Sequence, residues 1–443
     1  MRRIAAILCS AAILASYPGI AALGQEPEIA IPVGAGVSGS SLFGQEEGWT
    51  GGDVQAAGDA RAAGDVQASG DVQTAGDAQA APADQSQAAV QIAAPSAILM
   101  EASTGQVIYE KDADEKRSPA SVTKVMTLIL IFDALQSGKI QLTDEVVTSA
   151  HAKSMGGSQV FLEEGEKQTV ETLIKCIVIA SGNDASVAMA EYIAGSEDEF
   201  VRMMNERAAS LGMSNTHFVD CCGLTESPDH YTTARDIAIM SRELILNHPD
   251  IRNFTTIWMD SIRGGQFQLA NTNKLVRFYE GATGLKTGST DAAGYCLSAT
   301  AERDGMELIA VVLKAKTSEQ RFESAKSLLN FGFANYTLTD VYPGQALPPV
   351  DVLLGEQDTV QPVLAQSSRI LVDKAQLNDV TSELRLCENV EAPVEQGQKL
   401  GEMVISVGGQ EQQTIPIVAD RAVARLTLPG IFSRFLKTLF MAE

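Results

Sequence analysis

Aromatic residues, histidine and positive charge are all scarce in this chain of 443 residues. Phe, Trp and Tyr make up 5% of it, four residues are histidine, and 33 Lys and Arg stand against 56 Asp and Glu, for a formal net charge of −23. Such an acidic chain repels phosphate backbones and has few rings to stack on bases, so nucleic acid is not an expected partner. The sequence has no HExxH motif, and we expect neither a catalytic zinc ion nor any other metal or cofactor.

Cysteines are few and irregularly spaced. The chain has six: Cys9, Cys176, Cys221, Cys222, Cys296 and Cys387. Their spacing matches neither a zinc cluster nor a dense disulfide framework. Cys9 falls in a segment predicted below to be removed, so an odd number remains and at least one thiol stays unpaired in a monomer. We expect small, mostly buried hydrophobic residues; a functional disulfide, strained if it joins the adjacent pair Cys221–Cys222, is the alternative.

The N-terminus has the pattern of an export signal. Two arginines within Met1–Arg3 precede an almost entirely apolar run, Ile4–Ser16, which is too short to span a bilayer stably. Small residues follow, up to a cleavage position after Gly24. We interpret residues 1–24 as a signal peptide, in preference to an uncleaved anchor, and expect the mature protein to be exported.

Residues 25–90 are low in complexity and acidic. Five hexapeptides of the type GDVQAA repeat within Gly52–Ala81, and residues 25–90 carry ten acidic side chains against a single basic one, Arg61. Few bulky apolar side chains occur there, so burial cannot offset the entropy lost on ordering. We predict a disordered acidic repeat linker; a short β-solenoid with a six-residue period is the alternative.

A serine and a lysine open the first long apolar helix after this linker. Short strands are predicted at 96–100 and 106–109, then a helix with Ser118 as N-cap, Pro119 as its first residue and apolar residues at helical spacing over 122–135. Ser121 and Lys124 then share one helix face, and Ser121 lies in the first turn, where N–H groups favour developing negative charge. Lys124 can accept the serine proton only if burial or a neighbouring cation destabilises its ammonium form.

Two further polar motifs follow. Ser181-Gly182-Asn183 lies between helical runs predicted at 170–180 and 184–192. Lys286-Thr287-Gly288 precedes strands predicted at 295–301 and 308–313, and we place Lys286 at the end of an edge strand, followed by a glycine that allows close backbone approach. The ordered set SxxK, SxN and KTG is typical of penicillin-binding proteins and class A β-lactamases.

The chain resembles the serine-type D-alanyl-D-alanine carboxypeptidases, the low-molecular-mass penicillin-binding proteins. The resemblance runs from about Ala94 to the C-terminus and includes the stretches SPASVTK, SGNDA, GLKTG and RFESAKSLLNFG. It implies an α/β (α+β) transpeptidase domain of the penicillin-binding-protein and β-lactamase-like type over residues 94–340, followed by a small all-β domain. It also implies removal of the C-terminal D-alanine from peptidoglycan stem pentapeptides, with β-lactam antibiotics as covalent inhibitors.

The resemblance further implies a role for each motif residue. Ser121 would attack the carbonyl of the penultimate D-alanine, Lys124 would take its proton, and Ser181 would relay a proton to the leaving amine. Backbone N–H groups of Ser121 and Ser289 would form the oxyanion hole. The implied substrate-binding residues are Asn183, Lys286, Thr287, Gly288, Ser289 and Arg321, with Thr287 at the terminal carboxylate and Arg321 adding charge for it.

Two departures leave alternatives open. Ser289 stands where some relatives carry a histidine, which concerns rate and pH dependence rather than reaction class. Glu243 begins an ExxLN pattern, which in class A β-lactamases supplies the deacylating glutamate; in a helix predicted at 233–247 we expect an exposed glutamate instead. A β-lactamase and a non-catalytic cell-wall scaffold are the alternatives to the carboxypeptidase.

The C-terminal third carries no catalytic constellation. Short β-type runs, such as 369–372 and 399–407, predict a small β domain over 345–427. Residues 428–443 predict an amphipathic helix, with six bulky apolar side chains on one face and Arg434 and Lys437 on the other. We expect it to lie in the membrane interface and to hold the protein at the outer face of the cytoplasmic membrane, beside the cell wall; packing on the β domain is the alternative.

Overall fold

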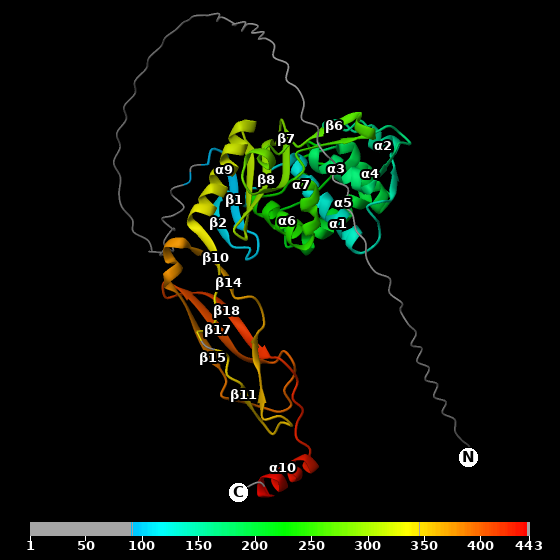
Figure 1. The fold of residues 1–443 in the computed structure, drawn as a ribbon. Helices are drawn as coiled ribbons and strands as arrows, with labels where there is room; N and C mark the ends of the chain where they lie inside the picture. Colours follow the sequence, from blue (N-terminus) through cyan, green and yellow to red (C-terminus); the bar gives the residue numbers. More distant parts are fainter. Residues whose placement is uncertain (1–89, 91, 345, 441–443) are drawn as a thin grey trace, which may run out of the picture. The chain divides into compact units, whose positions relative to one another are not determined.

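The computed structural model describes residue 90, residues 92–344 and residues 346–440 (Figure 1). The predicted signal peptide and nearly all of the predicted acidic linker lie outside these residues. The described chain has helices and a large sheet first, and short strands after them.

A five-stranded antiparallel sheet organises the first domain. Its spatial order is β2-β1-β9-β8-β7, with β1 at Ser96–Glu101, β2 at Val107–Lys111, β7 at Ala282–Thr290, β8 at Gly294–Arg303 and β9 at Met306–Ala315. Helix α9 (Ser318–Asn335) packs on one face and α6 (Ala234–Asn247) on the other. Successive residues of β1 point to opposite faces of the sheet. Ile98 packs in the apolar core on the α6 side, and Leu99 packs in the core on the α9 side. The predicted pair of short N-terminal strands is confirmed.

Most of the remaining helices lie between β2 and β7 in the chain. They and the short strands among them are η2 (Ala120–Thr123), α1 (Lys124–Gln136), β3 (Glu145–Val147), α2 (Ala150–Lys153), β4 (Lys167–Thr169), α3 (Val170–Ile179), α4 (Asn183–Ala194), α5 (Glu197–Ser210), η3 (Pro249–Ile251), α7 (Arg252–Thr255), β5 (Met259–Ile262), η4 (Arg263–Gly265), β6 (Phe267–Ala270) and α8 (Leu275–Phe278). The side chains of Thr169 and Thr233 accept backbone N–H groups and so cap α3 and α6. The helices predicted at 170–180, 184–192 and 233–247 are confirmed.

The start of the first long helix differs from the prediction. Ser118 does not cap it: the first turn, η2, is a 3₁₀ turn preceded by Pro119, and no side chain caps it. The chain enters this turn through Ala120, whose φ is 49°, so the preceding residues do not follow the path of a regular capped helix. Lys124 therefore begins α1, and α1 is buried along most of its length because it lies inside the helical core.

The predicted small β domain is present after α9. Its strands are β10 (Tyr336–Asp340), β11 (Val350–Leu353), β12 (Thr359–Val360), β13 (Pro362–Leu364), β14 (Arg369–Asp373), β15 (Val380–Leu386), β16 (Asn389–Glu391), β17 (Lys399–Val407) and β18 (Gln410–Ala419), with η5 at Lys374–Asp379. They form three sheets: β10-β14, β12-β11-β16 and β13-β18-β17-β15. Two small apolar clusters, around Ile405 and around Val423, form its core.

A C-terminal helix, α10 (Leu428–Phe440), follows the β domain as predicted. Several of its large apolar side chains, among them Phe432 and Phe435, are exposed. Within the described part of the chain, no helix combines the length and the hydrophobicity that a membrane span requires.

Candidate active site

Lys124 is the centre of a buried hydrogen-bond cluster that includes Ser121. Its Nζ lies 3.0 Å from Ser121 Oγ, 2.6 Å from Asn183 Oδ1 and 2.7 Å from the carbonyl oxygen of Cys222. The lysine side chain is fully buried and none of these three partners is a carboxylate. Burial lowers the pKa of Lys124 below the usual lysine value, although nearby thiols and carboxylates oppose the shift. A lysine in this setting is suited to accept the Ser121 proton.

Both ends of the Asn183 amide are engaged. Its Oδ1 accepts from Lys124, and its Nδ2 donates to the carbonyl of Gly156 at 2.8 Å. The Asn183 backbone N–H donates to Ser158 O at 2.7 Å. A loop over residues 156–166 therefore holds the second motif against α1.

Ser181 has a strained backbone and an unsatisfied hydroxyl. Its φ is 61°, a left-handed conformation that costs a residue with a Cβ about 1–3 kcal/mol. The side chain is buried, and its Oγ has no hydrogen-bond partner among the described residues. A buried hydroxyl without a partner is also unfavourable, so both features indicate a group held ready for a ligand.

The third motif lies in the middle of the edge strand β7, whereas the sequence placed Lys286 at its end. The strand continues to Thr290 because it pairs with β8 along its length, with Lys286 opposite Ser298. Hydrogen bonds to β8, formed by residues before and after Lys286 in the strand, therefore fix the position of the motif.

The side chains of the third motif add positive charge and a hydroxyl. Lys286 is buried, and its Nζ donates to the carbonyl of Thr287 at 2.9 Å. Burial, together with the charges of Lys124 and Arg321, holds the pKa of Lys286 well below that of an ordinary lysine. The Thr287 hydroxyl donates to Thr272 Oγ1 at 2.7 Å.

Gly288 brings this strand against the nucleophile. A Cβ at Gly288 would lie 2.7 Å from the carbonyl oxygen of Pro119 and 2.9 Å from the backbone nitrogens of Ser121 and Val122. Only glycine permits that approach. Ser289 follows Gly288 in the strand and is exposed, so its backbone lies directly beyond the point where β7 touches the Ser121 turn.

Arg321, in α9, contacts the backbones of β7 and β8. Its Nη1 donates to the carbonyls of Gly288 and Cys296, both at 3.3 Å, and the rings of Phe322 and Tyr295 lie against its guanidinium. No carboxylate of the described residues forms an ion pair with it, and burial lowers its pKa to about 10. Arg321 thus supports the third motif through its backbone and adds an uncompensated charge there.

Glu243 belongs to a different cluster. Its carboxylate accepts from Arg207 at 2.5 Å and from Asn247 at 2.7 Å, so it links α5 and α6. It is more buried than predicted, since 16% of its side chain is exposed. None of its contacts is with the Ser121 cluster.

The five cysteines of the described chain are all free thiols. Four are buried and Cys387 is exposed. The expectation of mostly buried, small hydrophobic residues is confirmed, and Cys221–Cys222 is not a disulfide.

Several residues of the cluster were missed by sequence reasoning. They are the Cys222 carbonyl, Gly156, Thr272 and Gly223, where a Cβ would lie 1.9 Å from the carbonyl oxygen of Ala120. The first three act through a backbone carbonyl or a hydroxyl pair that no residue spacing marks. Gly223, with φ of 74°, was the one detectable signal.

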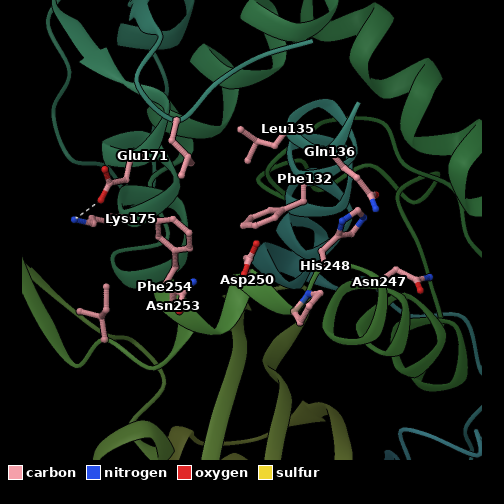
Figure 2. A pocket seen from close by; sticks show the side chains of 13 residues that line it. Phe132, Leu135, Gln136, Glu171, Lys175, Asn247, His248, Asp250, Asn253 and Phe254 are labelled. Atoms are coloured by element: carbon pink, nitrogen blue, oxygen red, sulfur yellow. Dashed lines mark ion pairs between the residues drawn. The ribbon is translucent and has the colours of Figure 1, made fainter. Parts of the chain in front are cut away.

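A separate cavity of about 790 Å³ lies among α1, α3 and α7 (Figure 2). Phe132, His248 and Phe254 line it, beside an ion pair in which Lys175 Nζ lies 3.1 Å from Glu171. It contains none of the motif residues, so volume alone does not locate the candidate active site.

Comparison with known proteins bears on the family of the chain. Residues 81–317 match the D-alanyl-D-alanine carboxypeptidase family of S11 peptidases, and residues 336–425 match the C-terminal domain of penicillin-binding protein 5. The D-alanyl-D-alanine carboxypeptidase DacF of Bacillus subtilis is 45% identical over 331 residues, which cover 74% of this chain and 85% of that protein. DacC of Escherichia coli is 34% identical and covers 79% of this chain and 88% of its own.

Solved structures agree. Penicillin binding protein 5 from Haemophilus influenzae superposes with a TM-score of 0.70 at 30% identity, covering 76% of this chain and 98% of that one. Penicillin-binding protein D2 from Listeria monocytogenes, in its ampicillin-bound form, gives a TM-score of 0.51 at 31% identity and covers 55% of this chain and 98% of its own. The predicted transpeptidase-like domain with a following β domain is confirmed, and the chain belongs to the D-alanyl-D-alanine carboxypeptidase family.

Proposed function

We propose that this protein is a serine D,D-carboxypeptidase that removes the C-terminal D-alanine from peptidoglycan stem pentapeptides through an acyl-enzyme on Ser121. One observation carries the assignment of the nucleophile: Ser121 Oγ lies 3.0 Å from the Nζ of a fully buried lysine. Because burial lowers the pKa of Lys124, a larger fraction of it is the free amine that can act as a base.

In the acylation step, Lys124 takes the Ser121 proton as Oγ bonds to the carbonyl carbon of the penultimate D-alanine. Backbone N–H groups of Ser121 and Ser289 stabilise the oxyanion, a role supported by the close approach of β7 to the Ser121 turn. The C–N bond then breaks, and Ser181, whose Oγ has no hydrogen-bond partner among the described residues, relays the proton that Lys124 took from Ser121 to the leaving D-alanine amine. Water hydrolyses the ester and releases the shortened peptide.

The terminal carboxylate is bound at the third motif. Thr287 would turn the hydroxyl proton that it now donates to Thr272 towards this carboxylate. Lys286 and Arg321 form no ion pair with a carboxylate among the described residues, so a bound carboxylate would favour the charged form of Lys286 beside the Arg321 guanidinium. Asn183 orients Lys124 and the substrate amide. β-Lactams would acylate the same serine, in keeping with the ampicillin-bound relative from Listeria monocytogenes.

The site favours this reaction over the two alternatives. The ExxLN glutamate that a β-lactamase would need for deacylation, Glu243, is paired with Arg207 instead. A scaffold would not require a strained Ser181 or a buried, uncompensated Lys286.

We also propose that the protein is exported and acts at the outer face of the cytoplasmic membrane, beside the cell wall. The N-terminal pattern of Met1–Ser16 supports export. For membrane attachment the support comes from α10, where the side chains of Leu428, Phe432, Phe435, Leu439 and Phe440 are 61% to 83% exposed. Such side chains are suited to the membrane interface. Arg434 contacts Asp358 of the β domain, and vesicle co-sedimentation distinguishes membrane attachment from packing on that domain.

Mass spectrometry of the mature protein tests the catalytic proposal. We expect a persistent penicilloyl adduct on the peptide that contains Ser121, and loss of one residue from a synthetic peptide ending in D-Ala-D-Ala. Ser121→Ala should show neither, and the exposed control Ser327→Ala should show both. Rapid penicillin turnover without a lasting adduct would indicate a β-lactamase. Neither adduct nor trimming would indicate a scaffold.

A further inference from the structure

Arg263 connects two segments on the helical side of the candidate active site. Its Nε and Nη2 donate to the carboxylate of Glu166 at 2.8 and 2.9 Å, in a bidentate pair. Its Nη1 also donates to the carbonyl of Val160 at 3.0 Å, and its Nη2 to that of Phe161 at 2.8 Å. One guanidinium therefore binds a carboxylate and two consecutive backbone carbonyls of the 156–166 loop.

The other side of this loop holds the second motif. The backbone N–H groups of Val160 and Leu162 donate to the carboxylate of Asp184 at 3.1 and 3.0 Å. Asp184 directly follows Asn183, whose Oδ1 lies 2.6 Å from Lys124 Nζ. Residues 160–162 are thus bound through their carbonyl groups by Arg263 and through their N–H groups by Asp184.

Arg263 itself sits at the turn between β5 and β6, and the far end of this hairpin reaches the third motif. Shortly after β6, the Thr272 backbone N–H donates to Ile179 O at 3.1 Å, and its Oγ1 accepts from Thr287 at 2.7 Å. The hairpin therefore spans from the loop of the second motif to the strand of the third.

The backbone at this junction is strained on both sides. The backbone φ of Arg263 is 53° and that of Phe161 is 57°, in the left-handed region that residues with a Cβ rarely adopt. The ring of Phe161 meets that of Phe267 edge-on at 6.2 Å, with the Arg263 guanidinium 5.7 Å from the Phe267 ring. The same left-handed conformation occurs at Ser181 in the second motif. Strain of this kind persists only where surrounding contacts over-determine the geometry.

We propose that Arg263 and Glu166 form a clamp that positions Asn183 and sets the spacing between the second and third motifs for acylation of Ser121. The inference rests on the proposed function. Arg263 is a positioning residue, because its donors are engaged by the loop and it acts through that loop and the hairpin. Since Asn183 contacts Lys124, a loosened loop would slow the proton transfer as well as widen the site.

The test compares Arg263→Met with Arg202→Met, which breaks the exposed ion pairs of Arg202 with Glu199 and Glu206 on α5. We would measure the rate constant and final stoichiometry of labelling by a fluorescent penicillin, and kcat and KM for a peptide ending in D-Ala-D-Ala. Arg263→Met should label to the same final stoichiometry but at least tenfold more slowly, with kcat reduced more than KM is raised. Arg263→Lys should restore only part of the rate, because an ammonium cannot form the bidentate pair and reach both carbonyls. Arg202→Met should match the wild type.

Each other outcome counts against the clamp. A lower final stoichiometry with an unchanged rate constant would show that Arg263 only stabilises the fold. If Arg263→Met does not fold, Glu166→Gln gives the decisive rate: a value within twofold of wild type overturns the clamp. The variant that combines Arg263→Met with Glu166→Gln should be labelled no more slowly than Arg263→Met alone, because both changes remove the contact between Arg263 and Glu166. If the wild-type protein itself is not labelled, the proposed function fails, a result distinct from normal labelling at an unchanged rate in Arg263→Met.

Discussion

Gly288→Ala tests whether the close approach of β7 creates the site. The added Cβ would lie 2.7 Å from Pro119 O and 2.9 Å from two backbone nitrogens of the Ser121 turn. These atoms are backbone and cannot rotate away, so the strand and the turn must separate by roughly 0.7 Å, from 2.7 Å to the 3.4 Å at which ordinary contact begins. A misplacement of about 1 Å can cost on the order of 100-fold in rate. We therefore expect acylation by penicillin to slow by roughly 10- to 100-fold.

The change should also destabilise the fold by about 1–3 kcal/mol, as overpacking does. The assay is the rate of penicillin labelling at a temperature below the melting transition, beside the thermal midpoint of each variant. Gly344→Ala is the matched control, because a Cβ there meets nothing within 4 Å. Labelling of Gly288→Ala at the wild-type rate would refute the reasoning, since it would mean that the spacing between β7 and Ser121 does not govern acylation.

Three further predictions concern the base, the clamp and the C-terminal helix. Lys124→Arg should abolish labelling and trimming because a guanidinium stays protonated; acylation at a near-normal rate would place the base elsewhere. Burial alone would raise the pKa of Glu166, but hydrogen bonds led by that from Arg263 lower it to about 2. Its contribution to stability is therefore present above about pH 4.5 and is lost as the pH falls towards 2, by ~1–2 kcal/mol for a partly screened pair. Acid titration of the thermal midpoint should show a smaller loss in Glu166→Gln, and identical curves would contradict this. Removing residues 428–443 should abolish co-sedimentation with anionic vesicles and leave soluble activity intact. Salt should weaken binding of the full-length protein only partly, because the apolar contribution survives screening; equal sedimentation of both proteins would favour packing on the β domain.

Much of the fold could be predicted from local patterns. The helices α3, α4 and α6 followed from helical runs of apolar residues, and β8 and β9 from apolar β-type runs after the third motif. The prediction was wrong at Ser118 and at Lys286. In both places a long-range contact decides the geometry: the first turn of α1 accommodates β7, and β7 is extended by its pairing with β8.

The chemistry of the site divides in the same way. The order of residues alone specifies which side chains are available: a serine and a lysine three positions apart, a second serine with an asparagine, and a third motif with a lysine, a threonine and a glycine. Their order was enough to indicate the family, because motif identity is a local property of the chain.

The packing of the folded chain buries Lys124 fully, gives it carbonyl, amide and hydroxyl oxygens as partners, and brings Arg321 to the Gly288 carbonyl. The same packing places the Arg263 guanidinium beside the Glu166 carboxylate and the Gly288 backbone against the Ser121 turn. These features escape sequence patterns because a pKa and a close backbone contact depend on every atom packed around a group. Those atoms come from segments far apart in the chain, whose positions are set by the packing of the whole domain.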